Sequence, residues 1–187
     1  MKKLLLSLAF ILSALLSGAA DYEIFDIDIN VRLLEDGSAD VTEYWQIDAR
    51  SGTEWYLVKR NLGDIGIGGL SVSENGSEFI YEGDWDIDRS ISEKAGRCGM
   101  VRKNDGYELC WGIGSYGRHS FTVRYVMTNV VKSLNDYDML HLQLVSPGLS
   151  ARPEHVIVNI TASEPLGNDN SRIWGFGYEG KVEYSRY

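Results

Sequence analysis

The sequence predicts an all-β protein folded as an antiparallel β-sandwich, and three observations carry this prediction. Apolar and polar side chains alternate in many short stretches, which is the period of two that a strand shows when one face is buried. Outside residues 1–20, no window of helical length carries an apolar stripe with a period of 3.6 residues. Turn-forming residues separate the short stretches, as they do in sandwiches and barrels.

Residues 1–20 are predicted to be a secretory signal peptide. Lys2 and Lys3 precede a mostly apolar run over residues 4–16, and small residues follow at 17–20. This order of features is typical of a cleaved signal, and the run is short for a membrane span of about 20 residues. An uncleaved membrane anchor is the alternative. The predicted division is therefore a signal peptide followed by a β-sandwich domain over residues 21–187.

The first strong element of the domain is a long β-hairpin over residues 22–48. Alternation runs through residues 25–33 and resumes through residues 39–48. A turn at residues 35–38 separates the two strands, and its Gly37 can take a positive φ. Since only one face of this hairpin is apolar, it needs a second layer to cover that face.

Glu43 contradicts the pattern of its own strand. It lies between Val41 and Trp45 at a position that the alternation assigns to the buried face. A buried carboxylate needs a partner, and Arg60, at the end of the next predicted strand, is the nearest candidate in sequence. We expect a Glu43–Arg60 ion pair that fixes the packing of the hairpin, with a catalytic acid as the alternative.

Further strands are expected along the rest of the chain. They fall at residues 53–59, 70–73, 78–81, 99–102, 107–111, 120–127, 138–145 and 154–162, with short strands near 172–176 and 181–184. Asn75 and Gly76 form the strongest hairpin-turn signal among them. Residues 82–96 show no regular alternation and are predicted to be an excursion at the surface.

The two cysteines are predicted to form a disulfide. Cys98 and Cys110 are equidistant from residue 104, which lies in the turn at residues 103–106. A hairpin with an odd-numbered loop would place them directly across from each other, close enough to bridge. In an exported protein a disulfide is the expected state. A metal site would need more ligands, and a catalytic cysteine would need a nearby histidine that the sequence does not place.

The sequence predicts no catalytic residue, metal site or cofactor. Asp84, Asp86 and Asp88 place oxygen ligands at alternate positions, as the start of an EF-hand loop does. Arg89 and Ala95 then stand where that loop needs a glycine and a glutamate. The three histidines show no repeated spacing, and no serine lies in a nucleophile elbow. A formal net charge of −9 argues against nucleic acid as a partner.

The aromatic content raises the question of sugar binding. The chain has five tryptophans and 11 tyrosines, and exposed rings can stack on the apolar faces of sugars. Most of these rings are expected in the core, as in other sandwiches. Trp85 lies in the irregular segment and is the candidate for stacking on a ligand.

Several short motifs resemble the family called domain of unknown function 2207 (DUF2207). They include Asp-Gly-Ser-Ala-Asp-Val-Thr-Glu at residues 36–43, Arg60 after a glycine, and Tyr-Glu-Leu-Cys-Trp-Gly-Ile-Gly at residues 107–114, with further similarity at 22–25, 117–125 and 138–140. The resemblance implies a signal peptide, an extracytoplasmic β-sandwich and then transmembrane helices in a predicted bacterial membrane protein. It implies no activity and no catalytic residues. The paired cysteines are not part of the family pattern, so the disulfide prediction depends on hairpin geometry.

Together these features lead us to expect a non-catalytic ectodomain with a recognition or structural role. It would work on the periplasmic or extracellular face of a bacterial membrane, with a protein or a cell-envelope glycan as its partner. Such domains are expected to continue into a membrane helix, so membrane association would come from sequence beyond Tyr187, and the chain would be a fragment or a shortened member. A secreted carbohydrate-binding module, or a glycoside hydrolase with paired carboxylates, is the alternative.

Overall fold

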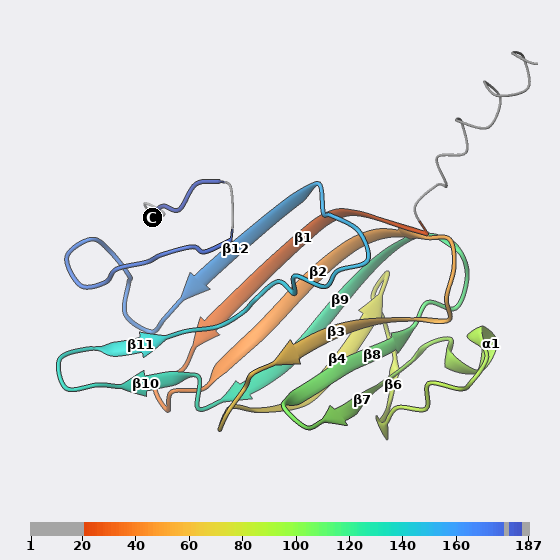
Figure 1. Cartoon of the computed structure of the whole chain (residues 1–187), viewed down its shortest axis with the longest axis horizontal. Coiled ribbons are helices and arrows are strands. Elements are labelled where there is room, and N and C mark those ends of the chain that lie inside the picture. The colour runs from red at the N-terminus through yellow and green to blue at the C-terminus, as the bar shows by residue number, and fades with distance from the viewer. Residues whose placement is uncertain (1–20, 178–179, 185–187) are drawn as a thin grey trace, which may run out of the picture.

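A computed structural model describes residues 21–177 and 180–184, so the predicted signal peptide lies outside the described residues. The domain consists of two large β-sheets, a small two-stranded ribbon and one single-turn helix. The two large sheets face each other with the core between them (Figure 1). This arrangement confirms the predicted all-β sandwich class. Within the described residues, no helix is long and apolar enough to span a membrane.

The larger sheet has six strands in the order β12-β1-β2-β9-β4-β5. Their bounds are β1 (Tyr22–Leu33), β2 (Ala39–Ala49), β4 (Gly66–Glu74), β5 (Ser77–Glu78), β9 (Gly117–Thr128) and β12 (His155–Thr161). The hairpin predicted over residues 22–48 is confirmed as β1 and β2, with Gly37 at a φ of +77° in its turn. All neighbours in this sheet are antiparallel except β12, which runs parallel to β1.

The smaller sheet has four strands in the order β3-β8-β7-β6. Their bounds are β3 (Glu54–Arg60), β6 (Ile80–Asp84), β7 (Arg97–Lys103) and β8 (Gly106–Gly112). Strand β6 runs parallel to β7, so this sheet is mixed as well. The sequence could not reveal these two parallel pairs, because side chains alternate with a period of two in either direction. The helix α1 (Ile91–Lys94) lies between β6 and β7 and begins with a capping box formed by Ser90 and Glu93.

The core fills the space between the two sheets and is rich in aromatic rings. The rings of Trp111 and Phe121 meet edge to face with centroids 5.5 Å apart, and Trp45 lies 6.0 Å from Trp55. Each pair joins a strand of the smaller sheet to a strand of the larger one. Full burial of one large apolar side chain is worth about 1.5–3 kcal/mol, so these contacts hold the layers together.

The second half of the chain departs from the predicted strands. The expected strand at residues 138–145 ends early, because β11 (Asp138–Leu140) pairs only with β10 (Val131–Ser133). The following residues run as an irregular stretch in front of β1 and β2 (Figure 1), and Leu142, Leu144 and Leu149 pack against the core. The strands expected near residues 172–176 and 181–184 are not formed in the described part of the chain.

Candidate functional site

Glu43 lies at the centre of a buried polar cluster in the sandwich. Its side chain is fully buried, and both carboxylate oxygens accept hydrogen bonds. Lys59 Nζ donates to Oε1 over 2.8 Å, the Tyr125 hydroxyl donates to the same oxygen over 2.5 Å, and Trp45 Nε1 donates to Oε2 over 2.9 Å. Three donors around one carboxylate satisfy a group that would otherwise be costly to bury.

The strand register explains why these side chains meet. Trp45 is two residues from Glu43 on β2, and therefore lies on the same face. Tyr125 lies on the neighbouring strand β9, where it pairs with Val41 of β2. Lys59 comes from β3 in the other sheet, so its ion pair with Glu43 joins the two layers.

The prediction that Arg60 is the partner of Glu43 was wrong by one residue. Strand β3 buries Trp55, Leu57 and Lys59, whereas Arg60 lies on the opposite face and is exposed. The period of two predicted for residues 53–59 already placed Lys59 on the face of Trp55 and Leu57.

Burial and a neighbouring charge keep the Tyr125 hydroxyl protonated. Desolvation raises the pKa of Tyr125 well above its ordinary value, and the negative charge of Glu43 raises it further. Tyr125 therefore remains a hydrogen-bond donor to Glu43. The Lys59 ammonium also lies 5.2 Å from the centre of the Tyr125 ring, so it contacts both the carboxylate and the π face.

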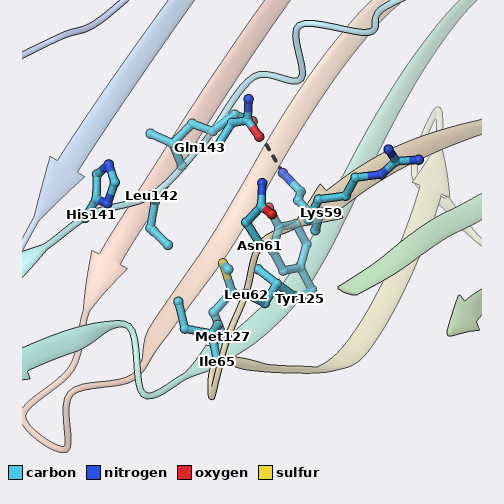
Figure 2. Close-up of a pocket in the computed structure, with 11 residues that line it drawn as sticks. Lys59, Asn61, Leu62, Ile65, Tyr125, Met127, His141, Leu142 and Gln143 are labelled. Atoms are coloured by element: carbon cyan, nitrogen blue, oxygen red, sulfur yellow. Dashed lines mark hydrogen bonds between the residues drawn. The ribbon is translucent and has the colours of Figure 1, made fainter. Parts of the chain in front are cut away.

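A small cavity lies beside Lys59, between β3, β9 and the irregular stretch (Figure 2). Residues 141–144 close one side of it, and Lys59 Nζ donates to the Leu144 carbonyl over 3.4 Å. The cavity volume is about 30 Å³, which is room for about one water molecule. Because Glu43 is surrounded by the chain's own donors and the cavity is this small, the arrangement acts as a clamp between the two sheets.

A second buried ion pair anchors the segment around α1. Lys94 is fully buried, and its Nζ lies 2.9 Å from Glu54 Oε2 and donates to Thr53 Oγ1 over 2.8 Å and to the Ile87 carbonyl over 2.6 Å. This lysine draws residues 82–96 against β3, while most other side chains of the segment are exposed, so the predicted surface excursion is anchored to the sandwich at Lys94. No pattern in the sequence pointed to Lys94, since a lysine in a short polar segment resembles any surface lysine.

The prediction that Trp85 stacks on a ligand was wrong. Only 6% of its surface is exposed, and its indole N–H donates to the Glu54 carboxylate. The Arg89 guanidinium lies 5.2 Å from the ring centre, and the Lys94 ammonium lies 5.9 Å from it. The ring is therefore used inside the domain to hold the α1 segment in place.

The disulfide prediction was also wrong, because the hairpin loop has two residues instead of an odd number. Lys103 pairs with Gly106, which places Cys98 opposite Trp111 and Cys110 opposite Gly99. Side chains of directly paired residues share a face, so the two cysteines lie on opposite faces of the sheet. Both are free and buried, and burial raises the pKa of Cys98 to about 11 and that of Cys110 to about 12.

His119 forms a further contact that sequence reasoning missed. Its Nδ1 lies 2.7 Å from Glu74 Oε1, its Nε2 lies 3.0 Å from the Ser115 carbonyl, and its ring stacks on Phe121. The contact ties the start of β9 to the end of β4. In the part of the chain that the structure describes, no group of three or more His, Cys, Asp or Glu side chains could hold a metal ion.

The comparison with protein families decides the relationship of this chain. A family model described as "Predicted membrane protein (DUF2207) N-terminal domain" matches residues 23–186. The chain belongs to the DUF2207 family. The match confirms the resemblance found in the motifs and covers both the sandwich and the stretch that follows β9. No curated protein matches this DUF2207 domain.

Solved structures show only a distant likeness to this DUF2207 domain. Native yeast LTA4 hydrolase matches at 11% identity and a TM-score of 0.38, covering 57% of this chain and 14% of the hydrolase. Yeast LTA4 hydrolase in complex with bestatin matches at 13% identity and a TM-score of 0.37, covering 57% of this chain and 14% of the hydrolase. A putative protease from Parabacteroides distasonis matches at 13% identity and a TM-score of 0.30, covering 59% of this chain and 23% of the protease. Likenesses this weak carry no argument about fold or function.

Proposed function

We propose that this DUF2207 domain is a non-catalytic recognition or structural domain on the periplasmic or extracellular face of a bacterial membrane. The observation that carries the proposal is the state of Glu43. Among the described carboxylates it is the most removed from solvent, and its two oxygens accept hydrogen bonds from Lys59, Tyr125 and Trp45. An acid committed in this way stabilises a fold and is not free to transfer protons to a substrate.

The distribution of apolar surface supports a binding role. Among the described residues, large apolar side chains are exposed before Val130, at Tyr44, Tyr56, Ile80, Tyr81, Ile87 and Tyr116, and more often after it, at Leu134, Tyr137, Met139, Ile157, Val158, Leu166, Ile173, Trp174, Phe176 and Val182. Where such side chains adjoin one another, their apolar surface can serve in binding a partner. The partner would be a protein or a cell-envelope glycan, and membrane association would come from sequence beyond Tyr187.

The proposed location draws on the family and on the start of the sequence. The family description is that of a predicted membrane protein, and residues 1–20 have the composition of a secretory signal. The negative net charge is compatible with a partner other than nucleic acid.

Two measurements test this proposal. The full chain is fused after Tyr187 to alkaline phosphatase, which is active only after export, and we expect enzyme activity in a bacterial host. The unfused protein is then incubated with purified cell-envelope polysaccharide, and we expect no release of reducing ends above a boiled-protein control. An inactive fusion would overturn the proposed location, and release of reducing ends would overturn the non-catalytic role.

A further inference from the structure

Strand β12 forms an edge of the larger sheet that carries none of the usual protection against pairing. Its inner neighbour is β1, and among the described residues no other backbone pairs with it. Residues 155–161 contain no Asp, Glu, Lys, Arg or Pro, and their register with β1 runs without a bulge. Open edges of this kind are templates for another strand.

The other three edges of the two large sheets are protected. Strand β5 has two residues, one of them Glu78. Strand β6 has an irregular register between Tyr81 and Asp84, and β3 carries the inward-pointing charge of Lys59 and ends in the exposed Arg60. Short length, bulges and charges are the devices that prevent edge-to-edge association, so β12 is the exception.

The backbone of β12 shows which groups face outward. The Glu154 N–H, at the start of the strand, donates to the Ile24 carbonyl of β1 over 3.0 Å. Backbone groups of successive residues point to opposite sides of a strand, so those of Val156, Val158 and Ile160 face β1. The N–H and C=O groups of residues 155, 157, 159 and 161 therefore face the open side.

We propose that β12 pairs antiparallel with β12 of a second copy of this chain, about a two-fold axis through Val158. In this register, Ile157 lies opposite Asn159 of the other copy, and His155 lies opposite Thr161. All four residues have outward-facing backbone groups, so each opposing pair exchanges hydrogen bonds. Val158 lies opposite its own copy in a non-hydrogen-bonded pair, as a self-complementary interface requires.

The side chains match in the same register. On the inner face Val156 meets Ile160 and Val158 meets Val158, so apolar groups meet apolar groups. Val158 is 40% exposed and Ile157 is 56% exposed in the single chain, and the second strand would cover part of both. Beyond the strand ends, Arg152 comes opposite Glu164 of the other copy, which places opposite charges together at both ends of the interface.

This inference rests on the proposed function in one respect, since it names the partner of a domain proposed to act by recognition. The two can fail separately. A monomeric chain would remove the pairing of β12 and leave the non-catalytic role intact, whereas an enzymatic activity would remove that role and leave the pairing intact.

The test uses cysteine cross-linking of the full-length gene product, purified after export. The Cα atoms of a non-hydrogen-bonded pair lie about 4.5 Å apart, within disulfide range, so Val158→Cys should give a disulfide-linked dimer on a non-reducing gel. Ile157→Cys is the matched control: it is more exposed but opposes Asn159, and should cross-link at least about fivefold less. The native Cys98 and Cys110 are buried and should not contribute.

A second variant tests the interface without a cross-link. Val158→Lys places two like charges opposite each other, and should make the chain monomeric in sedimentation from about 1 μM to about 200 μM, where the wild type dimerises by mass action. An unchanged melting temperature shows that the variant folds.

A monomeric wild type, equal cross-linking at both positions, or a dimer that survives Val158→Lys would overturn the proposal. The proposal would also be overturned if the amides of residues 157 and 159 were protected from hydrogen exchange equally at all protein concentrations. Such protection would mean that the chain's own residues 162–184, and not a second copy, cover the edge of β12.

Discussion

The domain has two regions that use similar sequence patterns and reach different degrees of burial. Residues 21–130 contain every buried residue of the described chain, including Glu43 and Lys94. After Val130, no described residue is buried, although β12 carries Val156, Val158 and Ile160 at alternate positions. Alternation in a strand shows which side chains share a face, but not whether anything covers that face. The sandwich is therefore complete in its first region and open in its second.

The largest expected effect comes from breaking the Glu43 clamp in the complete region. Lys59→Met should destabilise the domain by about 3–5 kcal/mol, because it leaves a buried carboxylate without its counter-charge. Arg60→Met is the matched control and should change stability by less than about 0.5 kcal/mol, since Arg60 is exposed. Urea unfolding followed by tryptophan fluorescence measures both values.

A double-mutant cycle sharpens this result. Glu43→Leu combined with Lys59→Met should recover much of the loss, because two apolar side chains replace a pair of buried charges. Additive losses would show that the two residues do not act as a pair. An unchanged melting temperature in Glu43→Gln would contradict the clamp itself.

Replacing a tryptophan with alanine should change the stability of the domain by different amounts in the two regions. Trp85→Ala should cost about 3 kcal/mol, since it removes a nearly buried ring and releases Glu54 and Lys94 from one contact. Trp174 is 71% exposed, and Trp174→Ala should change stability by less than about 0.5 kcal/mol. Equal losses in the two variants, measured by thermal unfolding, would mean that the second region is packed as tightly as the first.

The smallest expected effect concerns the rim of the complete region. Glu82 accepts hydrogen bonds from Arg89 and Arg97, and the pKa of this carboxyl is held below its ordinary 4.5, mainly by Arg89. A lowered folded-state pKa means that the stabilisation is present above the unfolded value and is lost as pH falls. The stability difference between wild type and Glu82→Gln should therefore be constant above pH 4.5 and shrink below it.

Glu78→Gln serves as the control for this titration. Its carboxylate lies 3.7 Å from Arg124 with 60% of the side chain exposed, so the substitution should have little effect at any pH. A Glu82→Gln difference that does not change between pH 6 and about pH 3 would contradict the role of the carboxylate charge.

The sequence predicted the features that depend on local pattern. The sandwich class, the hairpin over residues 22–48 and the burial of Glu43 all follow from a period of two and from turn chemistry. The partner of Glu43 could have been found by the same rule, since Lys59 shares the face of Leu57. The partner was wrongly predicted as Arg60 because that residue ends the strand, although its side chain lies on the outward face.

Other features depend on geometry that a period cannot supply. Whether Cys98 and Cys110 face each other depends on a loop of two residues or three, and both lengths fit the same turn residues. The folding of residues 82–96 depends on Lys94 reaching Glu54 across 40 positions in the chain, a contact with no local signal. The strands expected after residue 170 would need a neighbour that the described chain does not provide.

Hydrogen exchange on the full-length gene product, resolved by residue, tests the division into a complete and an open region most directly. At a concentration low enough to keep the chain monomeric, amides of β2 and β9 should be protected close to the global stability of the domain. Amides of residues 162–177 and 180–184 should exchange with little protection, because none of these residues is buried and none lies in a helix or strand. Protection in that second region equal to that in β2 and β9 would contradict the account.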